Sequence, residues 1–365
     1  MSENMLLLLP WIFFCGLTLT FAAINTTTDT LNISKGPTIA KPGCPSKCGD
    51  LAVPYPFGIG RGTGCGIGEF FELDCNNAFD PPRASIANIQ VYQISDNQMR
   101  ISNIMARKCY NGSNEEIIQS KFISTDISVT PYSFSELNRF TVIGCNDFAE
   151  VTGGASGRNF SAGCFSACLK LEDVRGGYCS GTGCCETSLA KSTFFIGGLN
   201  AREPNTSVSS FNPCSYAFVG EQKLFVFNGA SDLTDPNFMD RVMTTVPIVL
   251  DWAIGNLTCA EVRNSTDYAC QANSNCVDSD RWLGGYRCSC NEGYEGNPYL
   301  DPGCTDIDEC ADPNKNDCEK ICINTVGSYN CSCPEGENGI GRKDGRGCTA
   351  PKSRFPVIQV ALGSG

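Results

Sequence analysis

Side chains able to carry out acid–base, nucleophilic or metal chemistry are unevenly represented in these 365 residues. The chain has 39 Asp and Glu residues and 25 Cys residues, but no His. Without imidazole there is no Ser-His-Asp or Cys-His nucleophile, no His metal ligand and no ordinary proton shuttle near neutral pH. The chemistry that remains belongs to carboxylates and cysteines.

Paired carboxylates are what an enzyme of this composition would need, as in a glycosidase with two acids roughly 5 to 9.5 Å apart. Neighbouring acids occur at Glu69 with Glu72 and at Glu172 with Asp173, but neither pair differs from a charged turn. We therefore predict no catalytic residues and no enzymatic activity. The net charge of −12 also argues against nucleic acid as a partner, because that binding depends on Lys and Arg neutralising phosphates.

The N-terminus is typical of an exported protein. An apolar run over residues 5–19 is followed by small residues, which predicts a signal peptide at residues 1–23 and a flexible leader at residues 24–43. An uncleaved membrane anchor is the alternative, although about 15 apolar residues are short for a span of about 20. Export is also favoured by eight Asn-x-Ser/Thr sequons, at Asn25, Asn32, Asn111, Asn159, Asn205, Asn256, Asn264 and Asn330.

The cysteines indicate an oxidising compartment. Loss of Cys15 with the signal peptide leaves 24 of the 25, an even number that favours twelve disulfides. Cys-x-x-Cys does not occur, so no thioredoxin-type site is expected. Adjacent Cys184 and Cys185 are predicted to be structural, with separate partners. Spacing does not reveal the pairing among the twelve cysteines from Cys44 to Cys214.

Residues 44–247 contain short β-rich runs separated by Gly, Pro, Asn and Ser clusters. The predicted strands are at residues 86–94, 122–129, 140–143, 193–196 and 223–227. The glycine-rich stretch 58–68 lacks both the G-x-G-x-x-G spacing and the Gly-Lys-Ser/Thr ending of phosphate-binding loops. We therefore predict that it is a turn, with Cys65 in a disulfide.

Twelve further cysteines fall within residues 259–348, in two sets of six. In each set one residue separates the fourth and fifth cysteines, a spacing that resembles epidermal growth factor (EGF)-like modules. Such modules are too small for an adequate hydrophobic core and depend on disulfides. The resemblance implies these pairs: Cys259 with Cys276, Cys270 with Cys288, Cys290 with Cys304, Cys310 with Cys322, Cys318 with Cys331, and Cys333 with Cys348.

The second set of cysteines is accompanied by oxygen-bearing residues. Asp306-Ile-Asp-Glu309 precedes its first cysteine and Asn324 follows its third, which resembles the calcium-binding EGF pattern. Calcium takes roughly six to eight oxygen ligands in flexible geometry. The resemblance implies side-chain ligands from Asp306, Glu309 and Asn324, and carbonyl ligands from Ile307, Thr325 and Ser328. It also implies that Tyr329 packs against the first module, where the equivalent ligand positions are missing and no calcium is expected.

Longer strings complete a specific pattern: Cys44-x3-Cys48-Gly49, Val53-Pro-Tyr-Pro-Phe-Gly-Ile-Gly60, Phe70-Phe-Glu-Leu-Asp-Cys75-Asn-Asn77, Gly163-Cys-Phe-Ser-Ala-Cys168, Cys179-Ser-Gly-Thr-Gly-Cys-Cys185, Pro247-Ile-Val-Leu-Asp-Trp-Ala-Ile254 and Gly293-Tyr-Glu-Gly-Asn-Pro-Tyr-Leu300. Together they resemble the ectodomain of plant wall-associated receptor kinases. The family continues into a transmembrane helix and a kinase, and we expect this chain to lack both.

The resemblance implies a domain order with defined bounds. These are a galacturonan-binding cysteine-rich domain at 44–145, an associated cysteine-rich region at 146–250, an EGF-like module at 255–304, a calcium-binding EGF-like module at 306–348 and a juxtamembrane-like stub at 349–365. We therefore predict a mainly β, disulfide-rich fold, with a loop-rich, cysteine-stapled N-terminal β domain followed by two small EGF-like modules.

The implied ligand is pectin, as homogalacturonan or oligogalacturonides, with Ca²⁺ as the cofactor. A protein of net charge −12 must bind this polyanion through local cations, stacking on sugar rings or shared calcium. The candidate contacts are Arg61, Arg100, Arg107, Lys108 and Tyr92. Arg83 is more simply explained as a solvated side chain, and Tyr55 and Phe57 as core residues.

The expected location is the cell wall or extracellular space, or the plasma membrane if the chain is a fragment of a full-length receptor. Cell-wall proteins and full-length receptors are further candidate partners. The alternative function is a calcium-stiffened pair of EGF-like modules that binds a protein of the cell wall, with the first domain purely structural.

Overall fold

The computed structural model describes residues 39–110, 116–155, 157–200, 206–281, 283–345 and 347–350. The predicted signal peptide, most of the predicted leader and stub, and the sequons at Asn25, Asn32, Asn111 and Asn205 lie outside the described residues. The other four sequon asparagines are exposed: Asn159, Asn256, Asn264 and Asn330. In the described part of the chain, no helix combines the length and apolar character needed to cross a membrane.

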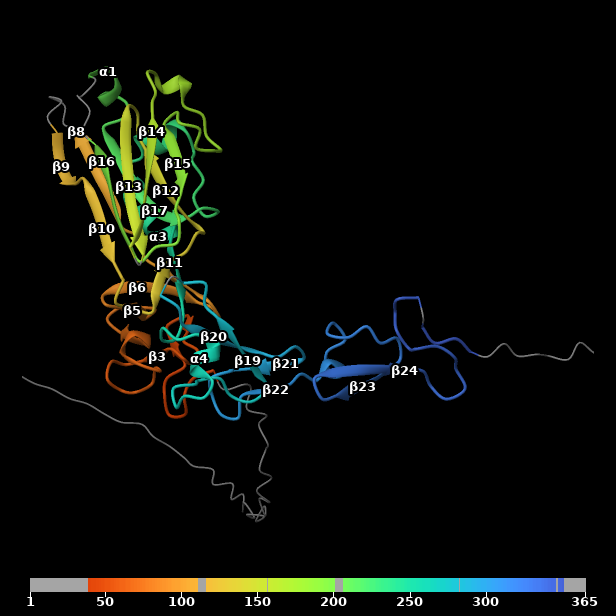
Figure 1. Ribbon diagram of the computed structural model, residues 1–365. Helices are drawn as coiled ribbons and strands as arrows, with labels where there is room; N and C mark the ends of the chain where they lie inside the picture. The colour runs from red at the N-terminus through yellow and green to blue at the C-terminus, as the bar shows by residue number, and fades with distance from the viewer. Residues whose placement is uncertain are drawn as a thin grey trace, which may run out of the picture. The chain divides into compact units, whose positions relative to one another are not determined.

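A seven-stranded sheet is built mainly from the first hundred residues (Figure 1). Its order is β11(Tyr132–Phe134), β18(Ile248–Trp252), β7(Gln98–Ile101), β6(Ile89–Ile94), β5(Arg83–Ile86), β4(Glu72–Asn76) and β3(Gly58–Ile59). Only the pairing of β3 with β4 is parallel, and a bulge interrupts the pairing of β6 with β7. A short hairpin, β1(Lys47–Cys48) with β2(Leu51–Ala52), precedes the sheet.

Two further sheets pack face to face above it. The five-stranded sheet has the order β15(Cys184–Ser188), β12(Asn138–Ile143), β17(Cys214–Glu221), β8(Met105–Tyr110) and β9(Glu116–Ser120). The four-stranded sheet has the order β10(Phe122–Asp126), β16(Phe194–Asn200), β13(Asp147–Ala155) and β14(Arg158–Ser166). The core between them includes Phe140 and Val142 from one sheet and Val151, Phe195 and Leu199 from the other.

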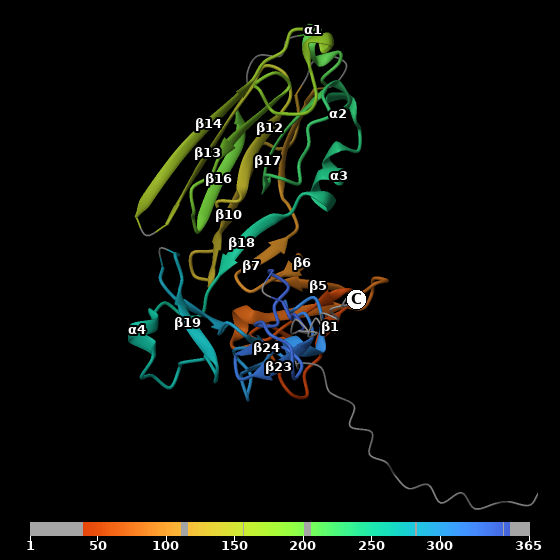
Figure 2. The same cartoon turned by 90° about the vertical axis from the view of Figure 1, so that its right-hand side faces the viewer.

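The five-stranded sheet is a middle layer, because helices cover its second face (Figure 2). Along β17, Ala217 and Val219 face the four-stranded sheet, whereas Tyr216 and Phe218 belong to the core on the helical side, as the period of two in a strand requires. Phe238 packs on Tyr216, with ring centroids 4.8 Å apart. The helices are α1(Thr206–Ser209), α2(Ala230–Thr234) and α3(Phe238–Thr245), with a 3-10 turn η2(Leu171–Asp173).

Strands were found in four of the five predicted runs, but not at residues 223–227. That run has no β partner and instead inserts Phe225 and Phe227 into the core on the helical side. Burial therefore explains the two Phe residues, whereas Leu224 and Val226 are 50% and 58% exposed. The strands also cross the division expected between residues 145 and 146: β8 pairs with β17, and β18 joins the first sheet. Strands from residues 44–145 and 146–250 therefore share sheets.

The two EGF-like modules follow β18. The first contains α4(Cys259–Val262), β19(Ser274–Asp278) paired with β20(Tyr286–Cys290), and β21(Tyr294–Gly296) paired with β22(Cys304–Asp306). The second contains η3(Glu309–Ala311) and the hairpin of β23(Ile321–Thr325) with β24(Ser328–Ser332). The mainly β, disulfide-rich fold is confirmed.

Twelve disulfides staple the described chain. The six in the EGF-like modules have the pairing that the resemblance implied. Cys184 and Cys185 have separate partners, as predicted. The pairs that spacing did not reveal are Cys44–Cys65, Cys48–Cys75, Cys109–Cys214, Cys145–Cys168, Cys164–Cys185 and Cys179–Cys184.

Candidate carbohydrate-binding face and calcium site

Strands β4, β5 and β6 bury one face and leave the other accessible to solvent. Leu73, Ala84 and Val91 belong to the core. Residues at the intervening positions point the opposite way, because successive side chains alternate across a strand. They form what we call the polar face, which consists of Asp74, Asn76, Arg83, Ser85, Gln90 and Tyr92.

Strand register arranges the polar face in two rows. Asp74 lies opposite Ser85, and Ser85 lies opposite Gln90. In the neighbouring row Asn76 lies opposite Arg83. Strands β5 and β6 are antiparallel, so the step of two residues back from Ser85 to Arg83 corresponds to the step of two residues forward from Gln90 to Tyr92. Tyr92 therefore continues the second row beside Arg83. Adjacent strands are about 4.8 Å apart, so each row presents polar groups at regular short intervals.

Two cationic side chains, Arg83 and Arg61, lie on or beside the polar face. The Arg83 guanidinium lies 4.3 Å from the centroid of the Phe79 ring. Arg61 pairs with Asp74 at 3.2 Å, with both side chains substantially exposed, and such surface pairs contribute little to stability. Tyr92 is 36% exposed. Partial burial raises the pKa of the Tyr92 hydroxyl, and the nearby Arg83 charge partly offsets that shift.

Of the five predicted contacts, Tyr92 lies on the polar face and Arg61 reaches it by pairing with Asp74. Arg100 does not, because its guanidinium forms a two-pronged ion pair with Glu221, at 2.8 and 2.7 Å. The hydrogen bond to Glu221 is the main reason that the pKa of Arg100 is raised. Arg107 packs on the Cys109–Cys214 disulfide, with its Nε 3.1 Å from the Cys109 sulfur.

Lys108 is the clearest correction to the predicted contacts. Its side chain is 1% exposed and forms an ion pair with Asp147, whose other carboxylate oxygen accepts a hydrogen bond from Ser215. Burial has the largest effect on the pKa of Lys108 and lowers it, but attraction to Asp147 and Tyr110 outweighs burial and raises the pKa above its ordinary value. A polymer in solvent cannot reach this ammonium group, so Lys108 is a structural residue.

The glycine-rich stretch is a turn, as predicted, and Cys65 is disulfide-bonded to Cys44. Its backbone amides do point at an anion, but the anion belongs to the protein. The buried Glu72 carboxylate accepts hydrogen bonds from the amides of Gly62, at 2.6 Å, and Gly64, at 2.8 Å. Glu72 thereby anchors the turn to β4, and the loop has no exposed anion site.

Four of the longer strings meet at Trp252, which belongs to one of them. Its ring contacts Phe57, Phe71 and Tyr299 with centroid separations of 5.2, 6.0 and 6.4 Å. Beside them the Asn297 amide donates to the carbonyls of Ile39 and Tyr55, at 3.1 and 2.6 Å. These strings therefore join the first EGF-like module to the seven-stranded sheet. The residues that meet at Trp252 serve packing.

The predicted calcium ligands also lie close together. Asp306 accepts hydrogen bonds from the Asn324 amide, at 2.9 Å, and from the backbone of Gly327. Glu309 is 8% exposed, and its Oε2 atom is buried without a hydrogen-bond partner in the described structure. Burying a carboxylate oxygen without a partner is costly, so this atom favours a cation beside it. The donor set is all oxygen, which suits Ca²⁺.

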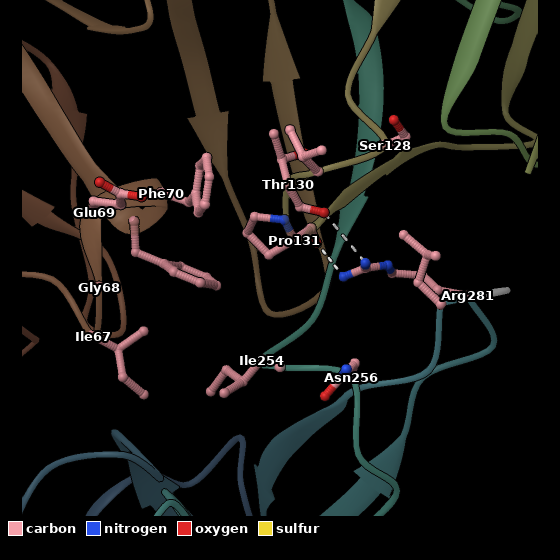
Figure 3. A pocket seen from close by; sticks show the side chains of 14 residues that line it. Ile67, Gly68, Glu69, Phe70, Ser128, Thr130, Pro131, Ile254, Asn256 and Arg281 are labelled. Carbon is pink, nitrogen blue, oxygen red and sulfur yellow. Dashed lines mark hydrogen bonds between the residues drawn. The ribbon is translucent and has the colours of Figure 1, made fainter. Parts of the chain in front are cut away.

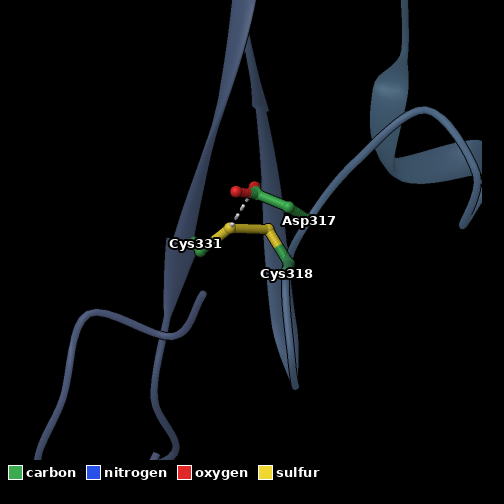
Figure 4. A group of neighbouring side chains, drawn as sticks. All are labelled: Asp317, Cys318 and Cys331. Carbon is green, nitrogen blue, oxygen red and sulfur yellow. Dashed lines mark hydrogen bonds between the residues drawn. A yellow bond between two sulfur atoms is a disulfide. The ribbon is translucent and has the colours of Figure 1, made fainter. Parts of the chain in front are cut away.

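The junction of the two modules differs in one respect from expectation. Tyr294 of the first module packs against Gly327, where an added Cβ would lie 3.0 Å from the ring. Ile307 also donates its amide to Gly293 at 2.9 Å. Tyr329, expected at this contact, instead donates its hydroxyl to Asp317 in its own module, at 2.8 Å. Asp317 lies beside the Cys318–Cys331 disulfide (Figure 4), whose bonded sulfurs are unavailable as metal ligands.

Two parts of the chain match known families. Residues 44–105 match the wall-associated receptor kinase galacturonan-binding family, and residues 306–348 match the calcium-binding EGF domain. The chain is 38% identical over 289 residues to wall-associated receptor kinase 2 of Arabidopsis thaliana, covering 78% of this chain. It is 37% identical over 290 residues to wall-associated receptor kinase 5 of the same plant, with equal coverage.

The chain is homologous to wall-associated receptor kinase ectodomains. It spans 37% of the length of the two relatives named. In this wall-associated receptor kinase homologue the polar face falls inside the galacturonan-binding match, whereas Arg107 and Lys108 fall outside it. The acidic cluster around Glu309 falls inside the calcium-binding match. Both matched domains are of the non-catalytic type found in ectodomains.

Sequence reasoning missed four residues of the polar face: Asp74, Asn76, Ser85 and Gln90. It also missed Phe79, on which Arg83 stacks. The available signal was the alternation of apolar and polar residues along β4 to β6, which becomes informative only once the register is known. Arg83 was considered and set aside as a solvated side chain. In the structure it stands at the centre of the polar face, between Asn76 and Tyr92.

Proposed function

We propose that this chain is an extracellular pectin-binding ectodomain and that the polar face binds de-esterified homogalacturonan or its oligomers. The observation that carries the proposal is the row of Asn76, Arg83 and Tyr92 on an exposed sheet face within the galacturonan-binding match. A guanidinium group binds a carboxylate through two parallel hydrogen bonds. An exposed aromatic ring presents an apolar surface to a sugar ring, and amides bind hydroxyl groups.

The polar face also explains how an acidic protein binds a polyanion. Arg61 is paired with Asp74, and the buried Glu72 carboxylate is bonded by the amides of Gly62 and Gly64. Arg83 stacks on Phe79 and thus supplies a local cation in a chain of net charge −12. Electrostatic attraction across such a patch is screened by salt, so affinity should fall as ionic strength rises.

The test is titration calorimetry of the secreted protein with defined oligogalacturonides at low salt. Arg83→Ala should weaken binding about tenfold or more, because a charge-assisted hydrogen bond contributes roughly 1.5 to 3 kcal/mol. Arg83→Lys should give an intermediate affinity, because Lys keeps the positive charge but lacks the planar guanidinium group that binds a carboxylate through two hydrogen bonds. Arg263→Ala, which removes an exposed cation of the first EGF-like module, is the matched control. Unchanged affinity in the Arg83→Ala Tyr92→Ala double variant would remove the polar face from the proposal.

We further propose that the second EGF-like module binds one Ca²⁺. Asp306, Glu309 and Asn324 would supply side-chain oxygens, and Ile307, Thr325 and Ser328 would supply carbonyls. The buried Glu309 oxygen without a partner supports this assignment. Extracellular modules bind with a Kd of roughly 10⁻⁴ to 10⁻³ M, which fits calcium outside the cell.

Glu309→Gln should weaken calcium binding at least tenfold in calorimetry on the full chain. Asp308→Asn is the matched control, because the Asp308 side chain accepts from the amides of Cys310 and Ala311 and caps η3, a role that Asn also fills. Equal calcium affinity of Glu309→Gln and the unaltered chain would contradict the assigned ligand set.

A protein-binding function for the second module is the other candidate. The observation in its favour is that Ile321 and Ile323 are exposed on the same side of β23, with Val326 in the adjoining turn. Replacing Ile321 and Ile323 with Ser should then abolish capture of a wall protein and leave pectin affinity unchanged. Loss of pectin affinity in that variant would instead connect the module to the glycan.

A further inference from the structure

A cavity of about 500 Å³ lies where the first EGF-like module meets two segments of the preceding sheets (Figure 3). Its walls come from residues 67–71, residues 128–131, residues 254–256, Arg281 and Leu283. The lining is mainly apolar, and the Phe70 ring is 39% exposed. The Phe70 backbone is held in place, because its carbonyl accepts a hydrogen bond from the Tyr132 hydroxyl at 2.5 Å. An exposed aromatic ring in a preformed hollow is a typical ligand contact.

Arg281 forms one wall of the cavity and is not an anion receptor. Its side chain is 6% exposed, and the guanidinium donates to the carbonyls of Pro131, Thr130 and Ala253 (Figure 3). Burial lowers the pKa of Arg281 to about 10, so the group is still charged at neutral pH. The Nη1 and Nη2 atoms face these backbone carbonyls, and Nε is buried without a hydrogen-bond partner in the described structure, so an external carboxylate finds no exposed guanidinium edge. The cavity therefore suits a neutral occupant with an apolar face and hydroxyl edges.

Asn256 stands at the rim of this cavity with a fixed backbone. Ile254, two residues earlier, exchanges backbone hydrogen bonds with Tyr286, at 2.8 and 3.1 Å. On the other side, an added Cβ on Gly284 would lie 2.5 Å from the Asn256 carbonyl oxygen, so these backbones are in direct contact. The Asn256 side chain is exposed and makes no hydrogen bond with the described residues. Figure 3 shows it beside Ile254 and Arg281 at the cavity edge.

Asn256 is also the acceptor of the sequon Asn256-Leu257-Thr258. We propose that Asn256 carries an N-linked glycan whose first N-acetylglucosamine residue lies in this cavity against Phe70. N-acetylglucosamine is neutral and has an apolar ring face, which matches the lining. The other described sequons do not line the cavity, so this role belongs to Asn256 alone among Asn159, Asn256, Asn264 and Asn330.

The covalent step uses a lipid diphosphate-linked oligosaccharide in the secretory pathway as donor. The bond between the sugar C1 and the diphosphate oxygen breaks, the bond from C1 to Asn256 Nδ2 forms, and Nδ2 loses one proton as the lipid diphosphate leaves. No oxidant or reductant is involved. The proposal requires passage through the secretory pathway, as the extracellular location does, but it does not depend on pectin binding.

The experiment uses the full chain secreted from eukaryotic cells. Glycopeptide mass spectrometry measures the fraction of Asn256 that carries a glycan. Hydroxyl-radical footprinting measures the oxidation of Phe70, which reports its exposure to solvent. Asn256→Gln should raise Phe70 oxidation several-fold. Phe79, which is 44% exposed and does not line the cavity, is the internal reference and should not change. Thr258 is left intact, because its hydroxyl bonds the Glu261 carboxylate at 2.7 Å and caps α4.

Asn264→Gln is the matched control, because it removes a neighbouring sequon of the same module away from the cavity. It should leave Phe70 oxidation unchanged. If Asn256→Gln fails to fold, the native glycoprotein is trimmed instead: a single remaining N-acetylglucosamine should still protect Phe70, and complete removal with a peptide amidase should expose it.

Three results would overturn the proposal. The first is an unmodified Asn256 in the folded, secreted protein. The second is equal Phe70 oxidation with and without the Asn256 glycan. The third is protection of Phe70 that arises only when oligogalacturonide is added to the glycan-free protein, which would assign the cavity to the polymer.

Discussion

Replacing Lys108 with Met tests whether this residue supports the fold or contacts pectin. The Lys108 and Asp147 side chains are 1% and 5% exposed, so the ion pair is fully buried between β8 and the start of β13. Met keeps much of the volume and removes the charge. The Asp147 carboxylate then retains a hydrogen bond from Ser215 but has lost its counter-charge.

Breaking one side of a buried ion pair costs about 3 to 5 kcal/mol, because an uncompensated charge is left in the interior. That loss is a large share of a typical stability of about 5 to 15 kcal/mol. With an m-value of about 2.5 kcal/mol/M, the urea midpoint should fall by roughly 1 to 2 M. Adding Asp147→Asn removes the unpaired carboxylate and should recover part of the loss, roughly 1 to 3 kcal/mol.

The assay is equilibrium urea unfolding followed by fluorescence, with disulfides kept intact. Lys223→Met, at an exposed lysine, is the control and should change stability by less than about 0.5 kcal/mol. Pectin affinity of the folded Lys108→Met protein should equal that of the unaltered chain. A stability loss below about 1 kcal/mol, or normal stability with lost pectin affinity, would refute the structural role of Lys108.

Three further perturbations probe other contacts. Asn297→Ala should cost about 1 to 3 kcal/mol and speed proteolysis next to the first EGF-like module, because two part-buried carbonyls lose their hydrogen-bond donor. The control variant Asn275→Ala, at an exposed position, should have neither effect. Glu72→Ala should destabilise the protein by a similar amount in urea unfolding, since two loop amides lose a charged acceptor, and an unchanged midpoint would contradict this. The hydrogen bond from Tyr329 is the main reason that the pKa of Asp317 is lowered. Asp317→Asn should therefore lower the melting temperature at pH 5 to 7. The difference in melting temperature between the variant and the unaltered chain should shrink as the pH falls below about 4, where Asp317 becomes protonated. A difference that stays constant down to the lowest pH would contradict this role of Asp317.

Sequence reasoning brought together correctly two residues that lie in the same small module. Asp306 and Asn324 are 18 residues apart in one disulfide-bonded module, and they are in contact in the structure. The polar face was predicted only in part, because Asn76, Arg83 and Tyr92 belong to three different strands. Whether such residues share a face depends on the pairing register, because a shift of one residue turns every side chain of a strand to the opposite face.

The sequence by itself determined the compartment, the disulfide-rich β class and the family. Cysteine number and spacing, the sequons and the ordered strings contain that information, because small modules of this kind depend on disulfides in place of a large core. The sequence did not determine which cationic side chains are exposed to solvent. Lys108 is buried in an ion pair with Asp147, which lies 39 residues away in the sequence. Arg83 is exposed, and the strand register places it opposite Asn76. Side-chain direction and burial arise from contacts between distant segments, so only the tertiary structure decided them.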